Sequence, residues 1–173
     1  EFVDRVNTFI MNFATTTKGG WPASSMYKYL NNESVEENSG ENSIISKLPN
    51  DLKKVIIDTT TISGHGSRDN VDYISKDKLY LLAPKEIYDD WSNQYDTAKD
   101  KTRQLDYYKN NGVTTSNRSG AVKYYNGSAV SWWLRSASTD SSGYFFFCIT
   151  SGGVVQSGYG NATLSVFPAF RIG

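Results

Sequence analysis

The chain has 173 residues, with 18 basic and 18 acidic side chains that give a formal net charge of zero. This length is typical of one domain, and the charge balance argues against a nucleic-acid binder, which needs an excess of Lys and Arg. The apolar runs are much shorter than the roughly 20 residues of a membrane helix, so we expect no direct membrane insertion. With one Cys and one His, the chain cannot form an internal disulfide or a Cys/His metal cluster, and we expect neither metal nor cofactor.

The first two thirds of the sequence predict short helices separated by polar loops. Residues 2–13 alternate loosely between apolar and polar and fit either a strand or a turn. Pro22 follows a Gly-Gly turn and marks a helix start, with Met26, Tyr29 and Leu30 on its buried face. Further helices are expected over 44–48, 49–55 (buried through Leu52 and Val55), 84–88, and from Asp96 or Thr97 to before Gly112 (buried through Ala98, Thr102, Leu105 and Tyr108).

Apolar and β-branched runs predict strands between and after these helices. The first two cover residues 55–62 and 78–82, with loops at 31–41 and 63–70. From Val113 onward the sequence predicts strands and loops. Because the helices come mostly first and the strands mostly later, the pattern indicates an α+β fold.

The segment from 136 to 170 contains a single charged residue, Asp140, while Ser, Gly and aromatic residues make up most of it. A stretch so poor in charge is either buried or a contact surface. Aromatic residues make up 14% of the chain, and Tyr and Trp are enriched at interfaces. The positions of these rings therefore decide between burial and contact.

Residues 144–150 predict a strand whose two faces differ. The odd-numbered face carries Phe and Ile side chains and suits the core. The even-numbered face mixes types, which suits exposure and makes it a candidate binding patch; it consists of Tyr144, Phe146, Cys148 and Thr150. The alternative is a strand buried on both faces, as in the middle of a sheet, with Cys148 as a small buried apolar side chain.

The rest of this segment predicts a turn, two strands and a loop. Gly152-Gly153 turns the chain into a returning strand over 154–157, followed by a loop over 158–161 with Tyr159 at its tip. Residues 167–172 predict a last strand that closes the domain. Before the segment, Trp132 and Trp133 point to opposite sides of a strand, one into the core and the other against a neighbouring loop.

Six short motifs occur in order along nearly the whole chain: Gly19-Gly20-Trp21, Tyr29-Leu30-Asn31, Leu48-Pro49-Asn50-Asp51-Leu52, Asp77-Lys78-Leu79-Tyr80-Leu81-Leu82, Trp132-Trp133-Leu134-Arg135-Ser136 and Pro168-Ala169-Phe170-Arg171-Ile172. Together they resemble the bacterial DUF6273 family, whose function is not assigned. The resemblance implies a C-type-lectin-like fold and a place in bacterial surface proteins. The expected location is therefore the cell surface, the extracellular space or a phage particle.

The stretch between the W-L-R-S and P-A-F-R-I motifs is also similar to the variable region of proteins diversified by diversity-generating retroelements. Those systems mutate template adenines, and AAY codons cannot then yield Lys, Glu, Met, Gln or Trp. Residues 137–166 contain none of these types except Gln156, which would be a fixed position. The resemblance implies one domain, 1–173, with a scaffold over 1–135, a variable region over 136–166 and a closing strand over 167–173.

Catalytic residues are only weakly indicated. His65 has no Ser or Cys partner near it in the sequence, and Asp89-Asp90 and Asp96/Asp100 fit helix caps and solvated surface as well as they fit an acid–base pair. Formylglycine-generating enzymes resemble the implied fold but use paired cysteines, whereas this chain has one. Calcium needs clustered oxygen ligands, and the C-terminal segment offers only Asp140 and Asn161. We expect neither an enzyme nor a calcium-dependent sugar site there.

The function expected from the sequence is ligand binding, as an adhesin or receptor-recognition module whose partner is a protein or glycan on another cell surface. The alternative is a fixed structural or cell-wall/glycan-binding domain. The chain begins without an initiator Met or a signal peptide, so we expect it to be part of a longer protein. The residues expected to contact the ligand are Ser138, Asp140, Ser142, Tyr144, Phe146, Cys148, Thr150, Val154, Ser157, Tyr159, Asn161 and Thr163.

Overall fold

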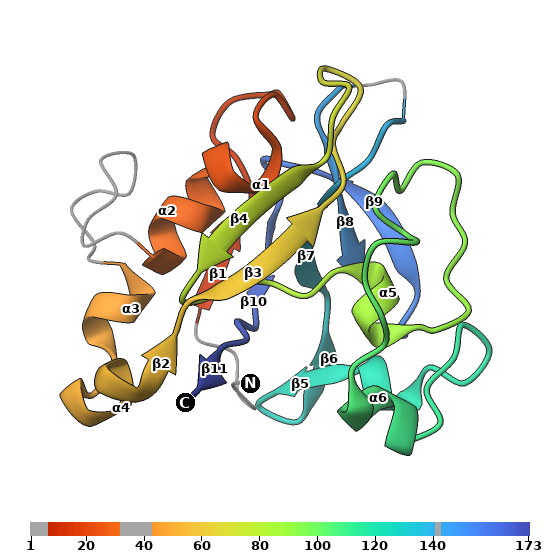
Figure 1. Ribbon diagram of the computed structural model, residues 1–173. Helices are drawn as coiled ribbons and strands as arrows, with labels where there is room; N and C mark the ends of the chain where they lie inside the picture. The colour runs from red at the N-terminus through yellow and green to blue at the C-terminus, as the bar shows by residue number, and fades with distance from the viewer. Residues whose placement is uncertain (1–6, 32–42, 141–142) are drawn as a thin grey trace.

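A five-stranded sheet lies at the centre of the computed structural model, which describes residues 7–31, 43–140 and 143–173 (Figure 1). The strands follow the order β1-β10-β7-β8-β9, and neighbours are antiparallel except for the parallel pair β10 and β7. Their bounds are Asn7–Ile10 for β1, Thr163–Val166 for β10, Trp132–Ala137 for β7, Phe145–Ile149 for β8 and Val155–Tyr159 for β9. Helices occupy mostly the first two thirds of the chain and strands the last third, so the predicted α+β class is confirmed.

Three two-stranded ribbons surround the central sheet. The antiparallel pairs are β2 (Ile56–Ile57) with β11 (Arg171–Ile172), β3 (Thr59–Ser63) with β4 (Tyr73–Asp77), and β5 (Lys123–Tyr125) with β6 (Ser128–Val130). In Figure 1 the ribbon of β3 and β4 crosses in front of the central sheet. The strand predicted over 55–62 is thus divided between β2 and β3, and β4 was not predicted because its residues are mostly polar.

The short helices largely follow the sequence prediction. They are α1 (Gly20–Ala23), α2 (Ser25–Asn31), α3 (Ile44–Lys47), α4 (Asn50–Val55), α5 (Pro84–Ile87), α6 (Asp106–Asn110) and the 3-10 turn η1 (Ser119–Ala121). Met26, Tyr29 and Leu30 are fully buried, as expected. Val55 is 41% exposed, against expectation, because the chain leaves α4 there and the next residue, Ile56, takes the buried position.

The long helix predicted between Asp96 and Gly112 is wrong, since only its last part forms α6. Side chains bind the backbone here in place of helical hydrogen bonds. Gln104 Nε2 donates to Ile87 O (2.7 Å) and Val113 O (2.8 Å), and Leu105 N donates to Glu86 O (2.9 Å). These bonds to distant residues hold the segment in turns and extended backbone.

Residues 79–82 are buried as predicted, whereas Lys78 is exposed, and the segment forms a single bridge instead of a strand. Tyr80 pairs with Ala169, and each backbone N–H donates to the other's carbonyl, at 3.0 and 2.7 Å. The predicted closing strand over 167–172 is likewise reduced to this bridge and β11. The C-terminal segment therefore closes against two separate elements, residue 80 and β2.

The W-L-R-S motif forms β7, in which all six residues are buried. Trp133 Nε1 donates to Phe9 O (2.9 Å) on β1, and Trp132 Nε1 donates to Ala121 O (3.2 Å) at the end of η1. Arg135 has no exposed surface and makes a two-pronged ion pair with Glu86, with Nη1–Oε2 at 2.6 Å and Nη2–Oε1 at 2.7 Å. The motif is thus a structural centre that joins β1, η1 and α5.

Candidate functional site

Strand β8 is buried on both faces, so the expected exposure of its even-numbered face is wrong. Phe146 and Cys148 have no exposed surface, and neither has Ile149. Phe145, at the start of the strand, is half-buried. The strand therefore follows the alternative of a central strand covered from both sides.

Different parts of the chain cover the two faces of β8. On the even face, Cys148 lies opposite Trp133 in the sheet register, and Gly158 of β9 leaves room for that ring, since a Cβ there would lie 3.4 Å from it. On the odd face, the ring of Trp91 packs edge-on against Phe147, with centroids 5.7 Å apart. Trp91 is more than 50 residues away from Phe147 in sequence, so the strand's own pattern does not reveal this cover.

Three of the predicted contact residues have no surface with which to contact a ligand. They are Phe146, Cys148 and Ser138, whose backbone N–H donates to Phe145 O (2.9 Å). Burial raises the pKa of Cys148 to about 11, so its thiol is neutral at physiological pH. A fourth predicted residue, Ser142, lies outside the described residues.

Two of the predicted residues, Tyr144 and Tyr159, meet in an aromatic cluster at the end of β9. Their rings stack with centroids 5.4 Å apart, and the Tyr159 ring meets Phe145 edge-on at 4.7 Å. Phe145 and Tyr159 are direct partners in the β8–β9 register. Tyr159 is 53% exposed and the other two are half-buried, so the cluster presents aromatic surface to solvent.

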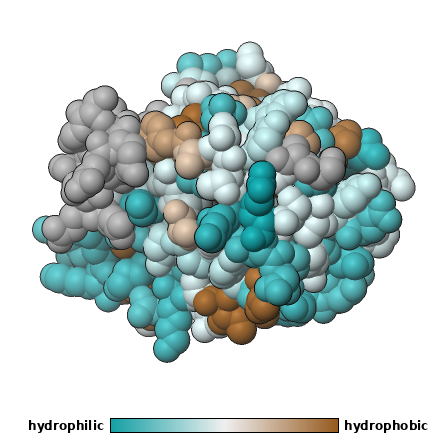
Figure 2. Space-filling model, turned by 90° about the horizontal axis from the view of Figure 1, so that it is seen from above, coloured by the Kyte–Doolittle hydropathy of each residue, from teal (hydrophilic) through white to brown (hydrophobic). Residues whose placement is uncertain are grey.

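The remaining predicted residues do not form one patch. Val154 stands at the other end of β9 from Tyr159, roughly 17 Å away at about 3.3 Å per residue. Thr163 begins β10, on the far side of β7 and β8 in the strand order. Val154, Asn161 and Thr163 are exposed, whereas Asp140, Thr150 and Ser157 are half-buried. On the face seen in Figure 2, apolar residues outside the grey segments likewise form separate patches among polar ones.

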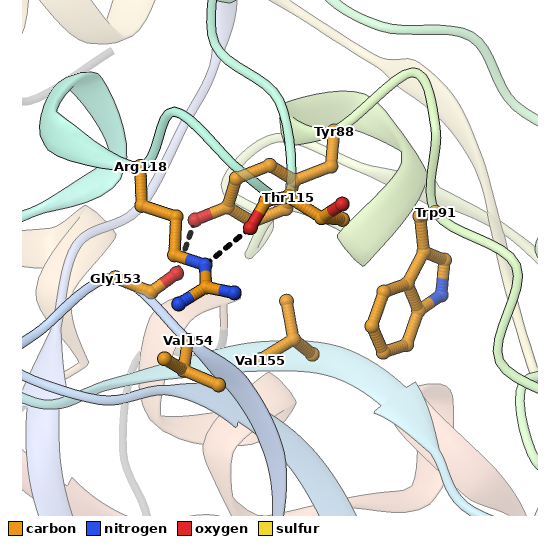
Figure 3. Close-up of a pocket in the computed structure, with 7 residues that line it drawn as sticks. All are labelled: Tyr88, Trp91, Thr115, Arg118, Gly153, Val154 and Val155. Carbon is orange, nitrogen blue, oxygen red and sulfur yellow. Dashed lines mark hydrogen bonds between the residues drawn. The ribbon is translucent and has the colours of Figure 1, made fainter.

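A hollow of about 90 Å³ opens beside the start of β9. The predicted residue Val154 lines it together with Gly153 and Val155, while the opposite walls are Tyr88, Trp91, Thr115 and Arg118. In Figure 3 the Arg118 guanidinium faces the Trp91 ring across the hollow, with Val155 between them and Val154 below the guanidinium. None of the four wall residues was predicted from the sequence, because they come from two loops outside the charge-poor segment.

Hydrogen bonds hold the walls of the hollow in place. Tyr88 OH donates to Gly153 O and Arg118 Nε donates to Thr115 O (Figure 3). Gly153 has φ +80°, and a Cβ there would lie 2.8 Å from Arg118 Cβ, so this turn position requires glycine. Burial raises the pKa of Tyr88 to about 12, which keeps its hydroxyl a donor.

The family described as "Domain of unknown function (DUF6273)" matches residues 7–173. The chain belongs to the DUF6273 family. No curated protein and no solved structure matches it. In this DUF6273 domain, Arg135 of W-L-R-S lies in the core, whereas Arg171 of P-A-F-R-I lines a second, more polar hollow of about 170 Å³ with Arg103 and Glu86.

None of the residues weighed for catalysis lines the hollow of Figure 3, although Asp90 and Asp96 accept hydrogen bonds from two of its wall residues. His65 is in the β3–β4 loop, where Nδ1 lies 2.8 Å from Gly66 O. Asp96 is buried, which raises its pKa, and it accepts hydrogen bonds from Trp91 Nε1 (2.8 Å) and Ala98 N (3.1 Å). Within the described part of this DUF6273 domain, no three His, Cys, Asp or Glu side chains are grouped to hold a metal ion, and no helix is long and apolar enough to span a membrane.

Proposed function

We propose that this DUF6273 domain is a non-catalytic ligand-binding module that presents the outer edge of β9 on a C-type-lectin-like scaffold. The observation that carries the proposal is the cluster of Tyr144, Phe145 and Tyr159, in which three touching rings reach solvent next to the last strand of the sheet. Tyr and Phe provide a large, rigid contact area, and partly exposed aromatic clusters are typical of interfaces.

The proposed partner is a protein or a glycan on another cell surface. The sequence from residue 143 to residue 170, which includes β9, contains no charged side chain. The edge of β9 therefore suits a contact made by rings, hydroxyls and backbone groups. The unpaired backbone of an edge strand adds hydrogen-bonding groups that a partner can use. The corresponding place of action is the bacterial cell surface, the extracellular space or a phage particle.

The finer form of the proposal is that the surface is diversified by a retroelement, with residues 1–135 as the scaffold and 136–166 as the variable region. Burial restricts where such variation is tolerated. Substitutions at Ser138, Phe146 and Cys148 would disrupt the packing around β8, so these positions are expected to stay constant. Variation is expected at exposed and half-buried positions, among them Asp140, Tyr144, Phe145, Thr150, Val154, Ser157, Tyr159, Asn161 and Thr163.

The test begins with glycan and protein arrays probed with the wild-type domain. Each ligand found is then titrated against the variant Tyr144→Ala/Tyr159→Ala and a matched control, Tyr124→Ala. Tyr124 on β5 is 59% exposed and Tyr159 is 53% exposed. The control therefore removes a surface ring that is as exposed as Tyr159. We expect the double variant to fold and to lose binding, while the control binds like the wild type.

Two outcomes would contradict the proposal. If the double variant binds as well as the wild type, the ligand uses another surface. If it unfolds, the rings belong to the core, and the alternative of a fixed structural or cell-wall domain gains support. The diversification proposal has its own test, a search of the gene locus for a near-copy of the 3′ end that differs only at template adenines, beside a reverse transcriptase.

A further inference from the structure

The hollow beside the start of β9 has walls that are fixed by neighbours outside it. The Trp91 indole donates to the carboxylate of Asp96, which is 1% exposed, and packs on Phe147. The Thr115 hydroxyl donates to Asp90 Oδ2 (2.6 Å) and its backbone N–H donates to Asp90 Oδ1 (2.9 Å). A site whose residues are held in this way is ordered before a ligand arrives, which lowers the entropy cost of binding.

Arg118 is the one charged side chain among the residues that line the hollow. Arg118 uses Nε to bind Thr115 O, and neither terminal nitrogen has a partner among the described residues. Partial burial favours the neutral form of Asp90, but hydrogen bonds from Thr115 outweigh it and hold the pKa below its ordinary value. Asp90 is therefore ionised but does not line the hollow. The two free nitrogens of Arg118 match the geometry of a carboxylate.

The rest of the lining is an aromatic and apolar surface with neutral polar groups at its rim. The Trp91 ring and the valines 154 and 155 suit the C–H face of a small ring, and the Thr115 hydroxyl oxygen suits a hydroxyl donor. The volume of about 90 Å³ equals that of roughly three water molecules at ~30 Å³ each. A carboxylate and the adjoining ring edge fit this space, while the remainder of a larger ligand stays outside.

We propose that this hollow binds the carboxylate and ring edge of an acidic sugar of the hexuronic acid type. Arg118 binds the carboxylate, and Trp91 packs against the ring. The inference goes beyond the proposed function, because the hollow lies at the start of β9 and the aromatic cluster lies at the other end of the strand. Binding of the sugar itself is a property of Arg118 and Trp91 and can be measured without the natural ligand.

The test is a titration of the domain with sodium glucuronate. Binding is measured in two ways, by NMR saturation transfer to the sugar and by the change in Trp fluorescence. We expect saturable binding of glucuronate and about tenfold weaker binding of uncharged glucose, since a hydrogen-bonded charge pair is worth about that factor. Arg118→Met is expected to weaken glucuronate binding by about tenfold and Trp91→Leu by a similar factor. Arg118→Lys, which keeps the charge but not the paired nitrogens, is expected to fall between the wild type and Arg118→Met.

The matched control is Arg103→Met, because Arg103 is also an exposed arginine but does not line this hollow. Equal glucuronate binding by the two Met variants, or equal binding of glucose and glucuronate, would overturn the proposal. Acetyl-aspartate N-methylamide, which imitates an acidic residue of a peptide, is a third probe. If it binds as tightly as glucuronate, the site recognises an acidic peptide and the sugar assignment is wrong.

The variant Tyr144→Ala/Tyr159→Ala separates this inference from the proposed function. It is expected to bind glucuronate normally, because its rings lie at the opposite end of β9. If the arrays yield no ligand but glucuronate binds through Arg118, only the proposed macromolecular recognition fails. If an array ligand depends on Tyr159 while glucuronate does not bind, only the inference about the hollow fails.

Discussion

Strands β8 and β9 are neighbours of equal length, and neither contains a charged residue, yet their environments differ. Four of the five residues of β8 are buried, whereas none of β9 is, and Gln156 and Tyr159 of β9 are exposed. The difference follows from the strand order, in which β8 has a strand on either side and β9 ends the sheet. The lack of charge in this segment therefore covers two different environments, a buried strand in β8 and a partly exposed edge strand in β9.

The stability of the buried strands depends most strongly on the ion pair between Arg135 of β7 and Glu86. Replacing Arg135 by Met leaves the Glu86 carboxyl group in the core without its guanidinium partner, since both Glu86 oxygens accept from the guanidinium. We expect Arg135→Met to lower the free energy of unfolding by about 3–5 kcal/mol, measured by urea denaturation.

The control for this effect is the double variant Arg135→Met/Glu86→Leu, which removes both charges. It is expected to recover much of the lost stability, because an apolar pair of similar volume avoids burying an unpaired charge. A loss below about 1 kcal/mol in the single variant would mean that the pair is more hydrated than its burial indicates.

The comparison of β8 with β9 is tested directly by the same change on each strand. The Phe146 ring packs against Gly160, so Phe146→Leu leaves a cavity there. We expect this variant to lose about 1–3 kcal/mol of unfolding free energy. Tyr159→Leu alters a side chain that is 53% exposed and is expected to change stability by less than about 0.5 kcal/mol. Equal losses at the two positions in urea denaturation would show that β9 is part of the core and would remove the proposed contact surface.

The fold was predictable where local signals determine the structure. Pro22 marked the start of the first helices, and Pro84 marked α5, because proline has a preferred place in the first helical turn. The segment after Asp96 resembled a helix, but Gln104 ties its backbone to Ile87 and Val113 instead. The pattern of apolar and polar residues does not reveal such hydrogen bonds to distant residues.

The candidate site was predictable only in part, for the same reason. Tyr144 and Tyr159 were placed on a contact surface by the lack of charge around them, and the structure brings their rings together. The exposure of Phe146 was predicted wrongly because Tyr144 and Thr150, which made the even-numbered face look mixed, lie outside β8, and the strand itself is apolar on both faces. Trp91 and Arg118 were missed, since only the folded chain brings their loops to the start of β9.

The smallest of the expected effects concerns the thiol of Cys148, on the buried side of the comparison. Burial raises its pKa from 9.0 to about 11, so at pH 8 about one native thiol in a thousand is ionised. We expect a thiol reagent to label the native domain only through opening of the fold, far more slowly than the domain in urea.

The same shift gives this prediction a pH dependence. Between pH 9 and 11 the native thiol keeps its proton while the unfolded one loses it, so stability falls as the pH rises through that window. The raised pKa of Tyr88 extends the fall to about pH 12. Cys148→Ala is expected to make the decline in unfolding free energy from pH 9 to 11 shallower, whereas Tyr159→Leu leaves it unchanged. Labelling of native Cys148 at the rate seen in urea would show that the even face of β8 opens to solvent, and the contrast between the two strands would then be lost.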